Sequence, residues 1–289
     1  MSRRARTAAA CLAACAALGG AATPVGAATP KRIVALTPFT ANTLAHLGVK
    51  PVGIGETLGG RERFAPSLRG VRRLPLSHPN GPNLEQLASL NPGLVFNSPT
   101  FAKGTQGMRA LKIRVATNEP RNIAGAVTET TRIGAIVGKR RQAAALAKSL
   151  RASVTKARKR IRDRPTVLLI LGVGRTPFTF LPNSWGGDVV TKAGGTLLTA
   201  GLKDRSGFAR ISDEAVVAED PDVIIAVPHA AAKDIPSITR YLRSNPAWAG
   251  TSAVRKKRVY VSTDNALLQP GTDVGATISR VRGSYLKNR

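Results

Sequence analysis

The sequence runs Asn83-Leu84-Glu85-Gln86-Leu87 into Leu94-Val95-Phe96, and the same layout returns in Ile211-Ser212-Asp213-Glu214-Ala215 and Val223-Ile224-Ile225. Each copy is typical of a short helix with an early glutamate, then a turn that contains proline, then an apolar strand. Asn83 and Ser212 are good helix N-caps, and a carboxylate in the first turn favours the helix dipole. Two such units far apart predict two similar lobes, and a cleft between two lobes is a common place for a ligand.

The charge balance of the chain is strongly positive. Its 289 residues include 44 Lys and Arg against 16 Asp and Glu, a formal net charge of +28, while the hydrophobic content of 43% can supply a proper core. Such basicity suits a soluble protein with a basic surface, or one that meets an anionic ligand, an anionic membrane or wall polymer, or nucleic acid. We expect no nucleic-acid partner, because helix-turn-helix and zinc-knuckle signatures are absent and the aromatic content of 4% offers few stacking platforms.

Residues 1–28 predict an export signal. A basic start is followed by an alanine-rich apolar stretch, and small residues around Ala28 provide a cleavage site. Both cysteines lie in this segment, so cleavage there leaves a chain without a disulfide. In the alternative, residues 12–15 resemble a lipobox and Cys15 becomes a lipidated first residue. Either form places the protein in the periplasm or at the outer face of the cytoplasmic membrane.

Strands that alternate with helices predict α/β lobes with central parallel sheets. We expect an N-terminal lobe over residues 31–138 and a C-terminal lobe over residues 165–289. Residues 139–164 contain no glycine or proline, and one apolar stripe at helical spacing runs through Leu146, Leu150, Val154, Ala157 and Ile161. About 25 residues at 1.5 Å each make a helix of roughly 37 Å, long enough to join the two lobes.

An ordered set of segments resembles one protein family: 32–38, 47–53, 83–85, 221–225 and 258–260. They are similar to the substrate-binding proteins of iron-siderophore, haem and cobalamin importers of the ATP-binding-cassette (ABC) type, over nearly all of the chain after the export segment. The resemblance implies two Rossmann-like lobes that move little, joined by one long helix, with the ligand held between them. It also implies that one exposed glutamate on each lobe docks with the membrane permease, and the matching residues are Glu85 and Glu214. The alternative for both is a first-turn carboxylate that only stabilises its helix.

Polar and aromatic side chains follow the predicted strands. Ligands of open parallel sheets bind beyond the carboxyl ends of the strands, which here carry Thr37, Phe39, Glu56 and Asn97 in the first lobe and Arg175, Trp185, His229 and Asn265 in the second. This mixture favours a bulky anionic metal chelate, and a ferric siderophore first, because a guanidinium pairs with chelate oxygens. Haem, with a histidine or Tyr260 as axial ligand, and cobalamin are the alternatives. For Trp185, a packing role is an equal alternative. We expect no permanently bound cofactor and no metal held by the protein alone.

An enzyme is the competing class of protein. The chain lacks a Gly-x-Ser-x-Gly elbow, a P-loop and a His-Glu-x-x-His helix. A secreted hydrolase would need Ser184, His229 and Asp264 to converge. We therefore expect a monomeric binding protein that captures a small-molecule metal chelate and delivers it to the permease of an ABC importer.

Overall fold

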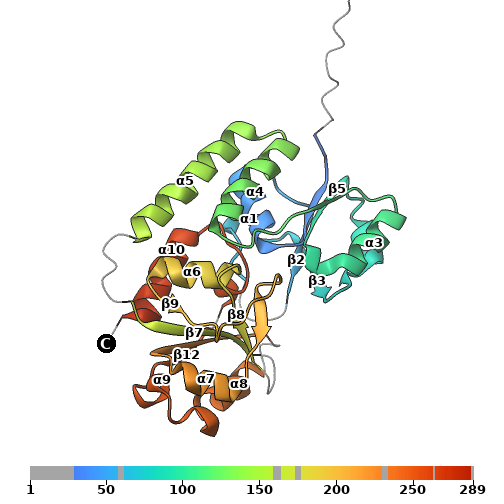
Figure 1. The fold of residues 1–289 in the computed structure, drawn as a ribbon. Helices are drawn as coiled ribbons and strands as arrows, with labels where there is room; N and C mark the ends of the chain where they lie inside the picture. The colour runs from blue at the N-terminus through green and yellow to red at the C-terminus, as the bar shows by residue number, and fades with distance from the viewer. Residues whose placement is uncertain are drawn as a thin grey trace, which may run out of the picture.

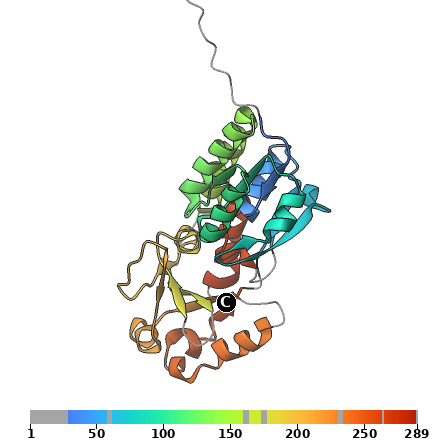
Figure 2. The same cartoon turned by 90° about the vertical axis from the view of Figure 1, so that its right-hand side faces the viewer.

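The protein has two lobes, each built on its own sheet. The structure is a computed structural model that describes residues 29–57, 62–158, 164–172, 177–229, 234–262 and 264–287. The lobes lie one above the other (Figures 1 and 2), which confirms the predicted two-lobed α/β fold. The predicted export segment with Cys15, and also Arg175, lie outside the described residues.

The sheet of the first lobe is parallel except at one edge. Its strands lie in the order β4 (Gly81–Pro82), β3 (Arg72–Ser77), β2 (Gly53–Glu56), β1 (Ile33–Ala35), β5 (Leu94–Asn97) and β6 (Val115–Thr117). Its helices are α1 (Pro38–His46), α2 (Leu84–Ser89), α3 (Ala102–Ala110) and α4 (Ile123–Ile136). Residues 66–82 are rich in glycine and proline, which predicts a loop-rich stretch, but the structure places strands there: β3 pairs parallel with β2 and antiparallel with β4. Pro75 has no backbone N–H to donate. A strand near a sheet edge tolerates the absence of this one hydrogen-bond donor.

The sheet of the second lobe has a parallel centre and an antiparallel edge. Its strands lie in the order β10 (Phe208–Arg210), β8 (Phe178–Phe180), β7 (Thr166–Gly172), β11 (Val223–Pro228) and β12 (Val259–Val261), with β9 (Thr196–Leu197) beside β7. Its helices are α6 (Trp185–Ala193), α7 (Asp213–Glu219), α8 (Ile235–Arg243), α9 (Ser252–Arg255) and α10 (Val274–Val281). The apolar run of β7 is fully buried from Val167 to Ile170, as expected of a central strand covered on both faces.

The repeated unit of the sequence is also a structural repeat. Helix α2 leads into β5, and helix α7 leads into β11. The Asn83 side chain accepts a hydrogen bond from the Gln86 N–H at 2.9 Å, and the Ser212 hydroxyl accepts one from the Ala215 N–H at 3.2 Å. Both predicted N-caps are therefore present, and each of the two glutamates is the second residue of its helix.

Helix α5 (Arg140–Arg158) packs against both lobes through a face of alanine and larger aliphatic side chains. It packs on α4 of the first lobe and on α6 and α10 of the second. Its buried face consists of Ala143, Ala147, Leu150, Val154 and Ala157; Leu146 is only half-buried, and Ile161 is outside the described residues. One apolar cluster extends from the first sheet through these helices into the second lobe. In the described part of the chain, no helix is both long and apolar enough to cross a bilayer.

Gly275 of α10 marks a close approach between this helix and α5. A Cβ atom at Gly275 would lie 2.7 Å from the Ser153 Cβ and 2.8 Å from the Ser153 carbonyl oxygen. Gly275→Val is therefore expected to push α10 away from α5 and to lower the free energy of unfolding by about 1–3 kcal/mol. Urea unfolding followed by circular dichroism measures this loss. In the control Gly283→Val, the new Cβ meets no atom within 4 Å; equal midpoints for the two variants would contradict the tight contact.

Candidate functional site

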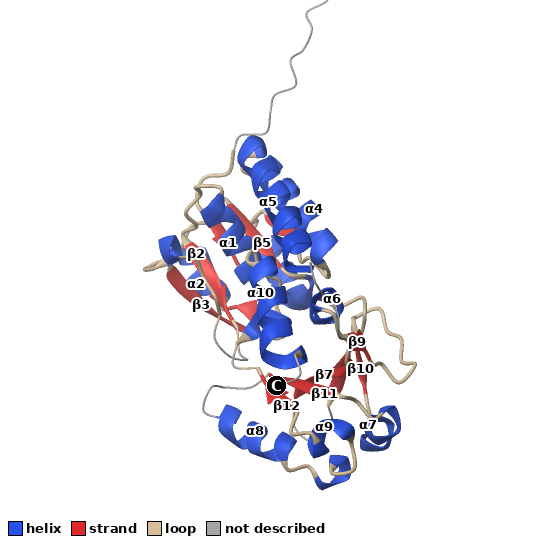
Figure 3. Ribbon diagram, turned by 90° about the vertical axis from the view of Figure 1, so that its left-hand side faces the viewer, coloured by secondary structure: helices blue, strands red, loops and turns tan. Residues whose placement is uncertain are grey.

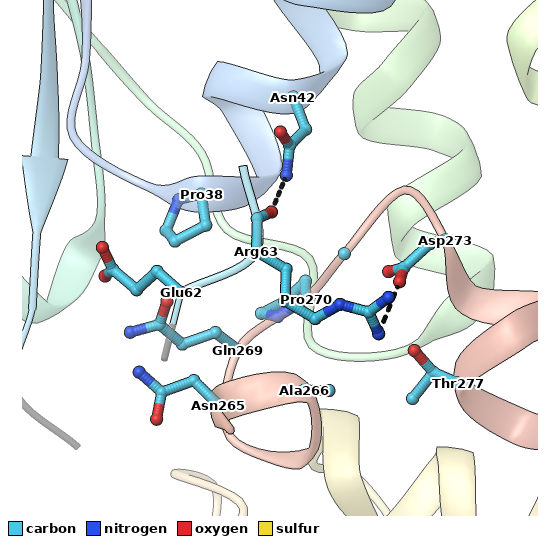
Figure 4. A pocket seen from close by; sticks show the side chains of 11 residues that line it. Pro38, Asn42, Glu62, Arg63, Asn265, Ala266, Gln269, Pro270, Asp273 and Thr277 are labelled. Carbon is cyan, nitrogen blue, oxygen red and sulfur yellow. Dashed lines mark hydrogen bonds and ion pairs between the residues drawn. The ribbon is translucent and has the colours of Figure 1, made fainter. Parts of the chain in front are cut away.

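Segments at the carboxyl ends of strands from both lobes meet at one pocket. Thr57 follows β2, Asn265 follows β12, and Gln269 of the second lobe donates a hydrogen bond to the Thr57 hydroxyl across the lobes. A second link is the ion pair of Arg63 with Asp273, at 2.9 Å. Figure 4 shows this interlobe pocket, a partly enclosed space of about 30 Å³ with a polar lining of Asn42, Glu62, Arg63, Asn265, Gln269 and Asp273.

The wall from the first lobe is fixed by Asn42 of α1. This side chain is 6% exposed, and it donates to the Arg63 carbonyl and accepts from the Ala65 N–H, both at 2.7 Å. Next to it, the backbone N–H and the hydroxyl of Thr57 donate to Glu62 Oε1 at 2.9 and 2.7 Å. These bonds hold the Glu62 carboxyl in place, and its second oxygen, Oε2, is buried without a partner among the described residues.

The wall from the second lobe is a turn over residues 265–267 that follows β12. The Trp185 indole N–H donates to the Ala266 carbonyl at 2.9 Å, so α6 supports the turn from behind. Asp264 caps the turn by accepting from the Ala266 N–H at 3.0 Å, and its other oxygen pairs with Arg280 at 3.0 Å. The turn presents Asn265, which is 3% exposed, to the pocket.

Several polar atoms of the pocket have unused hydrogen-bonding capacity. Glu62 Oε2, Gln269 Oε1 and both amide atoms of Asn265 are buried and have no partner among the described residues. Buried polar groups in proteins usually have partners. These atoms are closed off from solvent, so an incoming group could reach them only after the neighbouring side chains move. Burial raises the pKa of the Glu62 carboxyl; the hydrogen bonds from Thr57 oppose this rise without cancelling it, and the charge of Glu56 adds to it.

The predicted ligand residues have different surroundings. Asn265 lies in the pocket, Thr37 caps α1 beside it, and Glu56 is exposed at the end of β2. Phe39 and Asn97 are buried in the first lobe, at 1% and 0% exposure, and the Asn97 amide donates to the Thr105 hydroxyl at 2.7 Å. Trp185 is 4% exposed and supports the Asn265 turn, in line with the alternative packing role.

His229 follows β11 in the second lobe and has a counterpart in His78 of the first lobe. The residue is exposed, but partial desolvation of the ring, and then the positive charge of the nearby His78, lower the pKa of His229. His78 follows β3 of the first lobe, so the two histidines follow strands of different lobes. Within the described ranges, no three His, Cys, Asp or Glu side chains converge to hold a metal ion. Tyr260 packs against Tyr285, with ring centroids 5.3 Å apart.

The three residues that a hydrolase would need are engaged elsewhere. Ser184 caps α6 and donates to the Leu181 carbonyl at 2.6 Å, while Asp264 binds Arg280 and the Asn265 turn. Neither side chain has a hydrogen bond with His229, which is itself among the described residues. The geometry thus offers a binding pocket and no Ser-His-Asp arrangement in the described part of the chain.

The two candidate docking glutamates are exposed on different lobes. Figure 3 shows α2, which carries Glu85, in the upper lobe and α7, which carries Glu214, in the lower lobe. Hydrogen bonds from its own backbone N–H and from Ser212 lower the pKa of Glu214, so this carboxylate is charged at neutral pH.

The sequence did not predict Glu62, Gln269 or the Arg63–Asp273 pair. A partial signal existed for Glu62, because acidic residues are scarce in this chain and this one lies between two arginines in a loop after a predicted strand. No sequence pattern links Thr57 to Gln269, since the two lie 212 positions apart.

Known proteins share this two-lobed fold. The family model described as "Periplasmic binding protein" matches residues 33–266. A cobalamin-binding protein of Halobacterium salinarum is 27% identical over 266 residues, which cover 89% of this chain and 69% of that protein. The high-affinity heme uptake system protein IsdE of Staphylococcus aureus is 24% identical over 237 residues, 79% of this chain and 78% of that protein. An ABC transporter substrate-binding protein from Listeria monocytogenes has the same fold, with a TM-score of 0.76, 21% identity, and coverage of 89% of this chain and 99% of that chain. The chain therefore belongs to the periplasmic binding protein family.

Proposed function

We propose that this protein captures a metal chelate outside the cytoplasmic membrane, holds it between its lobes and delivers it to the permease of an ABC importer. One observation carries the proposal: both lobes contribute to the interlobe pocket, where buried polar atoms have no partner among the described residues. The similar proteins support a planar chelate, because one is named for cobalamin and another for heme. A ferric siderophore, which the basic composition favours, is the second candidate.

Two further features suit a planar chelate. An imidazole is a common axial ligand of haem iron, and His78 and His229 offer one from each lobe. Arg175, outside the described residues, stays a predicted partner for an anionic group on the chelate.

A ligand screen tests the proposal. The protein without its predicted export segment is mixed with cyanocobalamin, haemin, or ferric hydroxamate and catecholate chelates. We expect cyanocobalamin or haemin to raise the melting temperature, because a ligand at a hundred times its Kd stabilises the folded state by about 2.7 kcal/mol. Trp185 supports the Asn265 turn, so quenching of its fluorescence should report binding, and Trp185→Phe should remove most of that signal. Stabilisation by siderophores alone would favour the second candidate, and no stabilisation by any chelate would refute the proposal.

A further inference from the structure

Helix α5 concentrates positive charge on its exposed side. It contains no acidic residue, and its exposed cations form what we call the basic face: Arg140, Arg141, Lys148, Arg151, Lys156 and Arg158. Arg141, Lys148 and Lys156 follow one another at about two helical turns, so they form a row along the helix, opposite its buried side.

The cations of the basic face are not neutralised within the described part of the chain. They take part in none of the ion pairs found there. The only acidic residues of the helices that pack on α5, namely α4, α6 and α10, are Glu129 and Asp188, and each is bound to a cation of its own helix at 2.9 Å. The charge of the basic face is therefore available to a partner.

Helix stability does not account for the basic face. Arg140 and Arg141 occupy the first turn of α5, where the helix dipole disfavours positive charge. Because α5 has no acidic residue, no ion pair along the helix offsets this cost. A partner outside the protein gives these charges a role that the fold does not.

The exposed side of α5 suits an extended anionic partner. Apart from the cations, its exposed residues are alanine, serine, threonine and glutamine, and the large apolar side chains exposed in the described ranges all lie elsewhere. The 19 residues of α5 extend over about 28 Å, and Figure 1 shows the helix along the outer edge of the molecule. Attraction to such a partner is therefore electrostatic, without insertion of apolar side chains.

The place where the described chain begins favours a lipid bilayer as this partner. A Cβ atom at Gly138, two residues before α5, would lie 3.1 Å from the Thr29 hydroxyl, so the described chain begins beside one end of the basic face. Cys15 lies 14 residues earlier, and a chain of that length spans at most about 50 Å. On the predicted lipidation, the bilayer that holds Cys15 is therefore within reach of α5. Predicted cleavage near Ala28 would instead place a positively charged N-terminus beside the basic face.

We propose that the basic face of α5 binds the anionic lipid headgroups on the outer side of the cytoplasmic membrane. Each Lys or Arg near an anionic bilayer raises affinity by about fivefold, so six together can hold the protein there. The binding is reversible and weakens with salt, because the Debye length falls from about 10 Å at 0.1 M to about 3 Å at 1 M. It would keep the protein beside its proposed permease, and it does not depend on which chelate the protein carries.

Sedimentation with vesicles tests the basic face. The protein without its predicted export segment is mixed, in the absence of any chelate, with vesicles of phosphatidylglycerol and phosphatidylcholine in equal parts, or of phosphatidylcholine alone. We expect binding to the anionic vesicles only, and its loss at about 1 M salt. The variant Arg141→Gln, Lys148→Gln, Lys156→Gln should bind about a hundredfold more weakly, because three contributions of about fivefold are removed.

A matched variant controls for net charge. Arg210→Gln, Arg240→Gln, Arg243→Gln removes three exposed cations of the second lobe, away from α5, and should bind the anionic vesicles as the unaltered protein does. Equal losses in the two Gln variants would overturn the proposal, because net charge alone would then govern binding.

A second variant keeps the charge and changes the side chains. Arg141→Lys, Lys148→Arg, Lys156→Arg should bind normally, since anionic headgroups attract either cation, and a hundredfold loss in this variant would contradict an electrostatic contact. Failure of the unaltered protein to bind anionic vesicles would also overturn the proposal. So would binding to soluble polyphosphate but not to vesicles, which would indicate an anionic polymer as the partner. Because no chelate is present, each of these outcomes leaves the proposed function to its own ligand screen.

Discussion

A Glu85→Ala, Glu214→Ala double variant should fail in uptake while still binding its ligand normally. Both carboxylates are exposed at the start of equivalent helices, one on each lobe, so they can contact two arginine-bearing sites of a permease together. Loss of one member of a close ionic pair commonly costs a protein complex at least about thirtyfold in affinity, and here two pairs are lost. We expect cells that depend on this protein to take up the radiolabelled chelate that the ligand screen identifies at no more than a few per cent of the normal rate.

The control for this experiment also removes one carboxylate from each lobe. The double variant Glu129→Ala, Glu219→Ala changes the net charge by the same amount as the Glu85 and Glu214 variant. Its two residues lie elsewhere, in the interior of α4 and at the end of α7. Normal uptake by the Glu85 and Glu214 variant would show that these glutamates only stabilise their helices. Equal defects in the two double variants would indicate a general effect of charge instead of docking.

Trp248→Ala should cause the largest loss of stability among the substitutions considered for the second lobe. The side chain is 1% exposed and belongs to an apolar cluster that includes residues of β7 and β11. Its indole N–H donates a hydrogen bond to the Asp213 carboxylate at 2.7 Å. Truncation of a buried aromatic side chain costs about 3–5 kcal/mol, a large part of the roughly 5–15 kcal/mol that stabilises a typical domain. Because Asp213 begins helix α7, the same change should loosen the helix that carries Glu214.

Urea unfolding followed by circular dichroism measures this loss. Trp248→Phe keeps most of the apolar contact but removes the hydrogen bond to Asp213, so its midpoint should lie between those of Trp248→Ala and the unaltered protein. Tyr241→Ala removes an aromatic ring that is 41% exposed and should change the midpoint little. A midpoint for Trp248→Ala within error of that for Tyr241→Ala would show that the indole does not anchor α7.

The repeated helix–strand unit allowed the two lobes to be predicted from the sequence. N-caps and apolar runs are local signals, so α2 with β5 and α7 with β11 appear where the sequence suggests. Strands β3, β8 and β10 were not predicted, because β8 and β10 have only three residues each and because Pro75 lies within β3. Their formation depends on the neighbouring strands more than on their own composition.

The binding site was predicted less completely than the fold. The rule that ligands bind beyond the strand ends selected Asn265, and this residue lines the interlobe pocket. It also selected Phe39 and Asn97, whose side chains are buried in the first lobe, because the pattern of one strand cannot tell which neighbouring residues turn inward. Glu62 and Gln269 become neighbours only when the two lobes are packed together.

The single apolar cluster shared by both lobes limits how far the lobes can move relative to each other. With α4, α5, α6 and α10 packed into one core, capture of the ligand cannot swing the lobes far apart or together without breaking that core. The spacing of Glu85 and Glu214 should then be nearly the same with and without cargo. On the proposed function, protein without ligand should therefore compete with loaded protein for the same permease, and transport should depend on the ratio of the two as well as on the amount of ligand.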